Sequence, residues 1–196
     1  LLLSETDPLG NTTSYTYNSL GQILTKTDPK GGVVTNTYDG AGNKLSTTDE
    51  EGHSIFLTYD TGGNLLTEKN QLGHVTSYAY DASGNQTGIT DVFGAVTTFT
   101  YDSNGQQTSK SETRTTPTGP ETFTTQYQFD KTGKTVKVID PLGNFTATGY
   151  DATGKKTYSD DKNGNRTSYE YDNAGNLTKT TFPGSTFETS TYDANG

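Results

Sequence analysis

The feature that most constrains this chain is a short motif that returns every 21 residues. Successive ring positions 17, 38, 59, 80 and 101 differ by 21, as do 129, 150, 171 and 192, whereas the step from 101 to 129 is 28. An internal repeat sets the architecture, because each unit buries its surface against its neighbours. The motif is an aromatic residue followed by an Asp or Asn, with a Gly three residues after that Asp or Asn. Its copies are Tyr17 and Gly21; Tyr38, Asp39 and Gly42; Tyr59, Asp60 and Gly63; Tyr80, Asp81 and Gly84; Tyr101, Asp102 and Gly105; Phe129, Asp130 and Gly133; Tyr150, Asp151 and Gly154; and Tyr171, Asp172 and Gly175.

A second turn signal lies near the middle of each repeat. Asp28-Pro29-Lys30-Gly31 and Asp140-Pro141-Leu142-Gly143 place Asp first and Gly fourth, which favours a type I turn closed by a left-handed Gly. Turns of the two kinds therefore alternate along the chain. The sequence predicts an all-β fold, an antiparallel β-hairpin repeat array with two strands per repeat, forming a spiralling or tubular sheet.

Alternation along these strands predicts two unlike faces. Tyr15 and Tyr17 point to one side, and Thr16 points to the other. We expect an aromatic face and a face of Thr and Ser. A bulged turn places Tyr17, Tyr59 and Tyr171 opposite Ile23, Leu65 and Leu177, and a register shifted by one brings Leu24 and Leu66 there instead.

The long repeat contains seven additional residues around Thr116-Pro117-Thr118-Gly119-Pro120. Two prolines and a glycine disfavour a ladder strand, so we expect residues 110–124 to form a longer hairpin loop. The repeat phase resumes at Phe129, and residues 1–196 are interpreted as a single repeat array taken from a longer protein.

Composition narrows the functions open to such an array. The net charge is −9 and the pI is about 4.6, which disfavours nucleic acid and anionic membranes as partners. Cysteine is absent, so disulfides and thiolate metal sites are excluded. No segment is long and apolar enough to predict a membrane span.

The motif Tyr-Asp-x-x-Gly-Asn at this period resembles the YD repeats of the Rhs family, whose members include wall-associated proteins, shell subunits of toxin complexes and teneurins. The best copies are residues 59–64, 80–85 and 171–176. The resemblance implies a spiralling sheet that closes into a hollow shell, often around a C-terminal toxin. Departures from the motif, which we expect to weaken individual turns, are Asn18, Phe129, Gln22, Gln106, Lys134 and Lys155.

Candidate chemistry is sparse. His53 and His74 occupy equivalent positions in successive repeats, too far apart to share a zinc ion, and we interpret them as exposed turn residues. Residues 161–172 resemble a calcium loop but have Arg166 where that loop requires Gly. We assign no catalytic residue, no metal site and no cofactor.

The sequence therefore predicts a structural, non-enzymatic wall of a secreted or cell-surface Rhs-type shell, enclosing a toxin domain. The alternatives are an extracellular fibre or adhesin, and a carbohydrate-binding surface on the aromatic face. Expected partners are further repeats of the same or neighbouring chains through edge strands, and a toxin domain or glycans.

Overall fold

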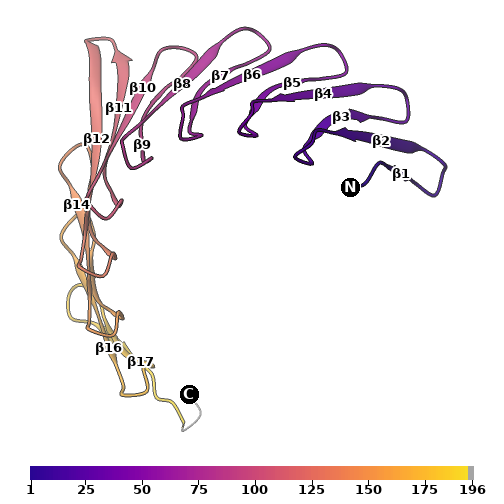
Figure 1. The fold of residues 1–196 in the computed structure, drawn as a ribbon. Coiled ribbons are helices and arrows are strands. Elements are labelled where there is room, and N and C mark those ends of the chain that lie inside the picture. The colour runs from indigo at the N-terminus through magenta and orange to yellow at the C-terminus, as the bar shows by residue number, and fades with distance from the viewer. Residues whose placement is uncertain (194–196) are drawn as a thin grey trace. The chain divides into compact units, whose positions relative to one another are not determined.

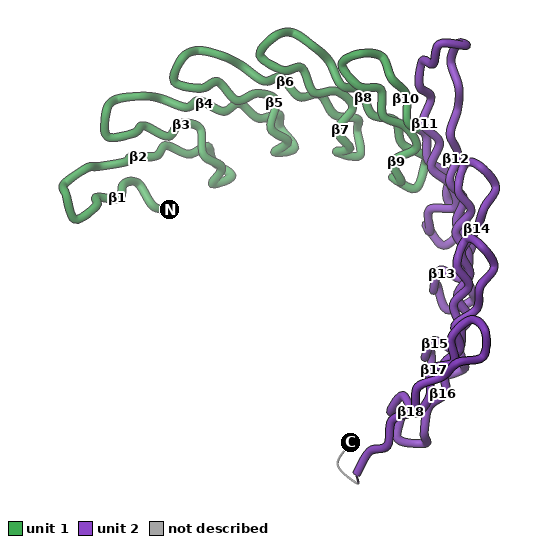
Figure 2. The backbone as a smooth tube through the Cα atoms, turned by 180° about the vertical axis from the view of Figure 1, so that it is seen from behind, with its two compact units in different colours: residues 1–97 green, residues 98–196 purple. Residues whose placement is uncertain are grey.

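The computed structural model describes residues 1–193, and each regular element in that range is a β-strand. Consecutive strands run antiparallel and are joined by short turns (Figure 1). The predicted all-β hairpin array is confirmed. The chain divides into two compact units, residues 1–97 and 98–196 (Figure 2), with the division inside strand β10 (Val96–Tyr101). Within residues 1–193 no helix is long and apolar enough to cross a membrane.

Unit 1 is a row of hairpins in which each strand pairs with the next. For example, Thr25 of β3 lies opposite Thr16 of β2 on one side and opposite Thr35 of β4 on the other. The strands are β1 (Ser4–Thr6), β2 (Thr12–Tyr17), β3 (Ile23–Thr27), β4 (Val33–Tyr38), β5 (Lys44–Thr48), β6 (Ser54–Tyr59), β7 (Leu65–Lys69), β8 (Val75–Tyr80) and β9 (Gln86–Thr90).

Unit 2 continues the same alternation of five- and six-residue strands after one longer pair. That pair is β11 (Gln107–Thr116) and β12 (Gly119–Phe129). The remaining strands are β13 (Thr135–Ile139), β14 (Phe145–Tyr150), β15 (Lys156–Asp160), β16 (Arg166–Tyr171), β17 (Leu177–Thr181) and β18 (Phe187–Thr189).

The loop expected at residues 110–124 is instead a paired ribbon. Pairing between β11 and β12 runs without interruption from Ser109 opposite Gln126 to Thr116 opposite Gly119, which leaves only Pro117 and Thr118 as the loop. Pro120 lies opposite Thr115, one pair beyond the closing pair of a two-residue hairpin. Ladder hydrogen bonds are absent at alternate pairs, so the missing N–H of proline is tolerated there. The sequence argument overestimated the effect of proline because it ignored this alternation.

The two faces of the sheet differ as predicted. Along β2 the exposed residues alternate with half-buried ones, and Tyr15 and Tyr17 are on the half-buried side. We call this side the aromatic face and the other the hydroxyl face. Among the described residues no apolar side chain is fully buried, and the buried polar side chains are Asn36 and Ser46. The sheet is a single layer, stabilised by its ladders and by contacts between neighbouring repeats.

Pairs on the hydroxyl face are matched to one another. Next to each hairpin bulge, one cross-strand pair recurs with the 21-residue period. Thr16 and Thr25 share a hydrogen bond of 2.7 Å, and at the equivalent position Glu170 and Lys179 form an ion pair of 3.1 Å. At a third copy, the ring of Tyr158 covers Gly149. Cross-strand pairs of this kind are the local unit of sheet stabilisation.

Candidate functional site

The repeated turn that begins at the motif Asp, here named the YD turn, is closed by its own residues. In the copy at residues 60–64, Asp60 N–H donates to the Asn64 carbonyl (2.9 Å) and Gly63 N–H to the Asp60 carbonyl (3.1 Å). The Asp60 carboxylate accepts from Gly62 N–H, Asn64 N–H and the Asn64 side chain at 2.8–2.9 Å. Gly63 has φ of 84°, a left-handed value that favours glycine. The hydrogen bond from the fourth residue to the first and the left-handed closing Gly are the features predicted for the second turn.

The same two backbone hydrogen bonds close every copy of the motif named from the sequence. They start at Asn18, Asp39, Asp60, Asp81, Asp102, Asp130, Asp151 and Asp172. The second turns, which start at Asp7, Asp28, Asp49, Asn70, Asp91, Asp140 and Asp161, are closed in the same way. The two kinds of turn are thus the same five-residue loop. It joins the strands at both of their ends, and we call the two rows of turns the two edges of the sheet.

Hydrogen bonding favours the ionised form of the Asp39, Asp60 and Asp81 carboxylates. The Asn64 side chain, followed by the Asn64 backbone N–H, lowers the pKa of Asp60 below its ordinary value. Asn43 and Asn85 lower the pKa of Asp39 and Asp81 in the same manner. These carboxylates therefore act as hydrogen-bond acceptors near neutral pH rather than as proton donors.

The motif ring lies opposite the first residue of the strand that leaves the turn. Tyr17 pairs with Ile23 and Tyr59 with Leu65, as expected for a bulged hairpin, and Tyr171 pairs with Leu177. The alternative register is not found. Leu24 and Leu66 are the additional bulge residues between two paired positions.

Some of the motif rings also contact the preceding repeat. The Tyr38 hydroxyl donates to the Ile23 carbonyl at 3.0 Å, and the Tyr192 hydroxyl donates to the Leu177 carbonyl at 2.9 Å, each 15 residues earlier. Burial, and secondarily the charge of Asp39 in the preceding repeat, raises the pKa of Tyr59. The rings therefore bind successive repeats together.

The residue after the turn Gly has a role that sequence reasoning missed. The Gln22 side chain donates to the Gly42 carbonyl of the next YD turn at 2.7 Å and accepts from Asn18 in its own turn at 2.9 Å. Gln106 reaches the Gly133 carbonyl at 3.0 Å. Gln and Lys at this position were expected to weaken their own turn, and that expectation stays a prediction. The structure adds that these side chains are long enough to link two turns.

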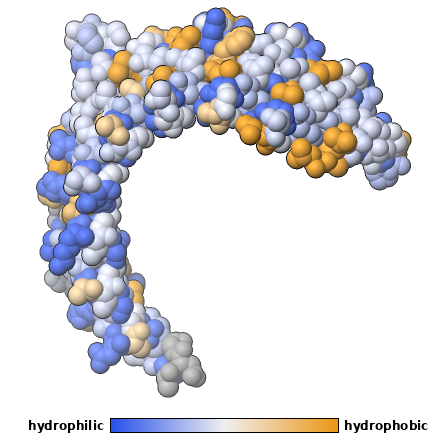
Figure 3. All heavy atoms as spheres, viewed as in Figure 1, coloured by the Kyte–Doolittle hydropathy of each residue, from blue (hydrophilic) through white to orange (hydrophobic). Residues whose placement is uncertain are grey.

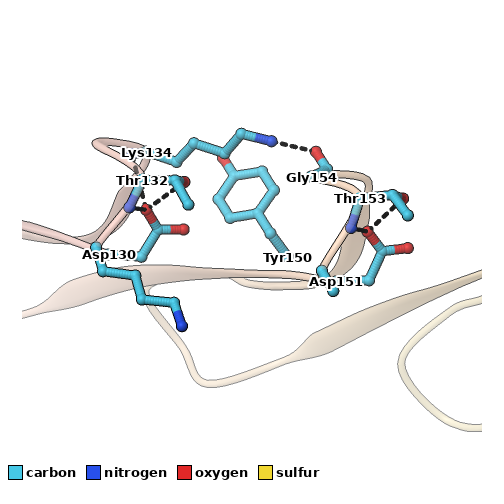
Figure 4. Close-up of a pocket in the computed structure, with 9 residues that line it drawn as sticks. Asp130, Thr132, Lys134, Tyr150, Asp151, Thr153 and Gly154 are labelled. Carbon is cyan, nitrogen blue, oxygen red and sulfur yellow. Dashed lines mark hydrogen bonds between the residues drawn. The ribbon is translucent and has the colours of Figure 1, made fainter.

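Figure 4 shows the same link made by Lys134, whose ammonium donates to the Gly154 carbonyl. The ammonium lies 4.8 Å from the centroid of the Tyr150 ring, a cation–π distance. Beneath it is an open groove of about 560 Å³ between the turns that begin at Asp130 and Asp151. Both carboxylates accept from a Thr hydroxyl in their own turn at 2.7 Å, and this hydrogen bond is the main cause of their lowered pKa.

The second turns are linked along the other edge by different residues. Lys162 donates to the Asp140 carboxylate at 2.8 Å, and Gln71 donates to the Asp49 carboxylate at 3.2 Å. Each donor is the second residue of its turn, the position that proline occupies in other repeats. Both edges of the sheet therefore carry side-chain links between successive turns.

Among the candidate metal ligands, Asp49 and His53 contact each other within one turn. In the part of the chain that the structure describes, ligand atoms of Asp49, Glu51 and His53 lie within 4.8 Å of one another. His53 Nδ1 is 3.2 Å from Asp49 Oδ2, and Glu51 and His53 are exposed. His74 is likewise exposed in the next turn. The calcium-like Asp161 accepts from Asn163 and Asn165, as any turn Asp does.

The sequence pattern of the RHS repeat family matches residues 1–33, 17–54, 59–96, 80–121 and 150–186. The chain belongs to the RHS repeat family. Among curated proteins none matches the sequence. The repeated turn, the motif ring and the links between turns are thus features of an RHS repeat array.

Two solved structures show the same fold at low sequence identity. One is the Photorhabdus luminescens Tc holotoxin pore with the TccC3-D651A mutation, which has a TM-score of 0.63 at 16% identity over 89% of this chain. The other is a crystal structure of TcdB2-TccC3-Cdc42, which has a TM-score of 0.50 at 16% identity over 97% of this chain. The RHS repeat array spans only 11% and 13% of those chains.

Proposed function

We propose that this RHS repeat array is a structural, non-enzymatic wall of a secreted or cell-surface shell, and that the shell encloses a toxin domain. The observation that carries the proposal is the single-layered sheet of matched hairpins, which has an aromatic face and a hydroxyl face and no fully buried apolar side chain among residues 1–193. Such a sheet separates two spaces without needing a core of its own. Membership of the RHS repeat family supports the same role.

The turn chemistry also favours a structural role. In the copies described above, the Asp carboxylate accepts hydrogen bonds from residues of its own turn. These hydrogen bonds lower the pKa of Asp39, Asp60 and Asp81. General acid–base catalysis needs a carboxylate or base that is free to exchange a proton with substrate. We infer that the repeated motif, Tyr17 to Gly175 in its eight copies, is a folding unit.

Contacts of the rings favour a wall over a sugar-binding surface. Tyr17 and Tyr38 are half-buried, and their hydroxyls donate to backbone carbonyls of the preceding repeat. A ring that is packed sideways in this manner has less face to offer a sugar. Binding of the array to immobilised glycans tests this point. Glycan binding by the unmodified chain that is lost in a folded Tyr59→Leu, Tyr80→Leu variant would favour a carbohydrate-binding function over a wall.

Electron microscopy of the natural protein that contains this array tests the shell directly. We expect a closed hollow particle, extended by further repeats of the same or a neighbouring chain through strand pairing. Limited proteolysis should leave an enclosed segment intact in the native particle and cleave it after denaturation. Open filaments would favour the fibre hypothesis over the shell. Cleavage of the internal segment in the native particle as fast as in a free peptide would do the same.

A further inference from the structure

One of the second turns combines three side chains of the kinds that bind metal ions. Asp49, Glu51 and His53 are the first, third and fifth residues of that turn, and their ligand atoms lie within 4.8 Å of one another. Hydrophilic side chains are spread over the face shown in Figure 3, so polarity alone marks no site. What distinguishes this turn is an imidazole together with two carboxylates in a single five-residue loop.

The other second turns do not have this combination. The next turn has His74 at the fifth position, but Asn70 and Leu72 stand where the two carboxylates would be. The remaining second turns have Leu, Lys, Phe or Asn at the third position and Asn, Gly or Ala at the fifth. These turns are closed by the same backbone hydrogen bonds, so the loop itself requires neither Glu51 nor His53.

The separation of the ligand atoms suits a zinc-like ion. His53 Nδ1 lies 3.2 Å from Asp49 Oδ2. Two ligands that are each about 2.0–2.1 Å from a zinc ion, at the tetrahedral angle, are about 3.3–3.4 Å apart. Glu51 is exposed, so its carboxylate is free to rotate towards the same point. His53 binds a metal through Nδ1 when its proton is on Nε2, and the ion then replaces the proton between Nδ1 and Asp49.

Neighbouring groups orient the Asp49 carboxylate and leave space for the ion. Backbone N–H groups of Glu51 and His53 donate to Asp49 Oδ1 at 3.1 and 2.8 Å. From the next turn, the Gln71 side chain donates to Oδ2 at 3.2 Å, and outer hydrogen bonds of this kind orient a ligating carboxylate. An open groove of about 430 Å³, lined by His53 and Gln71, has room for water as the fourth ligand.

We infer that Asp49, Glu51 and His53 together bind one divalent ion of the zinc type, with water completing its coordination. The pair His53 and His74 considered from the sequence spans two turns, whereas this site lies within one. A bound ion fastens the turn and stabilises the folded chain by mass action. The inference concerns a single turn and does not depend on whether the array forms a shell.

Isothermal titration calorimetry of the 196-residue chain with zinc chloride tests the inference. We expect one Zn²⁺ to bind per chain. His53→Ala and Glu51→Asn should each weaken binding by at least about tenfold, because loss of a supporting outer group alone typically costs that much. Ala95 and Asn163 occupy these positions in other closed turns, so both variants keep the loop. His74→Ala is the matched control and should leave the affinity unchanged.

Proton NMR locates the bound ion, because the chain has only two histidines. Zn²⁺ should shift the ring protons of His53 and leave those of His74 in place, and spectra of the two alanine variants assign the signals. Zn²⁺ should also raise the melting temperature of the unmodified chain and leave that of His53→Ala unchanged. Circular dichroism confirms that each variant is folded.

Four results would overturn the inference. Zn²⁺ could leave both histidine signals unshifted. His74→Ala could weaken binding as much as His53→Ala, as non-specific binding to exposed histidines predicts. Glu51→Asn could bind as tightly as the unmodified chain, which would remove the third ligand. Finally, Ca²⁺ at equal concentration could displace Zn²⁺, as a site of carboxylates alone predicts.

Discussion

A glycine within a strand illustrates how closely single residues are matched across this sheet. Gly149 of β14 lies opposite Tyr158 of β15, whose ring covers it. The guanidinium of Arg166 lies 3.8 Å from the centroid of that ring and makes two hydrogen bonds of 2.7 Å to Asp160. A side chain at position 149 would occupy the space of the ring.

We therefore predict that Gly149→Ala lowers the free energy of unfolding by about 1–3 kcal/mol, the usual cost of overpacking. The methyl group would displace Tyr158 and, with it, Arg166. Urea denaturation measures the change. Gly88→Ala is the matched control, because its nearest neighbour is the small Ala79 side chain at 3.4 Å, and it should be neutral or slightly stabilising. Equal destabilisation by both variants would contradict the role of the ring.

The link made by Lys134 gives a second prediction for a single residue. Lys134→Met keeps an unbranched apolar side chain near Tyr150, but it loses the donor to the Gly154 carbonyl and the charge over the ring. Loss of one hydrogen bond should reduce stability by about 0.5–1.5 kcal/mol in denaturant titrations. Lys134→Gln restores a donor of the kind present at Gln106 and should recover part of the loss. A Met variant as stable as the parent would show that the link contributes nothing.

At the scale of the element, the turn behaves as a titratable unit. The pKa values of Asp39, Asp60 and Asp81 are lowered in the folded chain, first by the Asn side chain of the same turn. Such groups stabilise the fold above the ordinary Asp pKa of about 3.9 and lose this contribution as pH falls through the lowered folded value.

We therefore predict that thermal stability falls as pH decreases below the ordinary Asp pKa of about 3.9 and towards the lower folded values. Scanning calorimetry across this range measures the effect. Replacing Asp39, Asp60 and Asp81 together by Asn, the residue that opens the turns at Asn18 and Asn70, should reduce the slope. An unchanged slope would assign acid sensitivity to other groups.

The ribbon of β11 and β12 is an element whose outer part pairs only within itself. Ser111 lies opposite Thr124, and in an ordinary repeat the equivalent pair, Thr48 and Ser54, is joined by a five-residue turn. Replacing residues 112–123 by Asp-Pro-Leu-Gly-Asn would restore the 21-residue spacing. We predict a folded protein whose melting temperature changes by only a few degrees. Loss of cooperative melting would show that the ribbon supports its neighbours.

Sequence reasoning succeeded for the contacts that lie within one hairpin. The turn residues and the pairing of Tyr17 with Ile23 depend on local backbone geometry, which the motif specifies. It failed at Gln22 and Lys134, because their partners lie 20 residues away and are reached only by the length of the side chain. It also failed at Pro120, whose tolerance depends on the alternation of ladder hydrogen bonds rather than on composition.

At the scale of the whole molecule, stability is distributed along the array. With no fully buried apolar side chain among residues 1–193, each hairpin depends on the next for its ladder and for the half-burial of its rings. Stability of such arrays is approximately a sum of unit terms and nearest-neighbour terms. Chains shortened from residue 181 in steps of 21 residues should melt at progressively lower temperature. A melting temperature independent of length would indicate a localised core.

The use of one loop on both edges has an evolutionary consequence. Because the turns named above are closed by their own Asp or Asn, their Gly and their backbone, a duplicated stretch of 21 residues brings complete turns with it and continues the strand alternation. Recombination between copies can therefore lengthen or shorten the array by whole repeats without redesigning any junction.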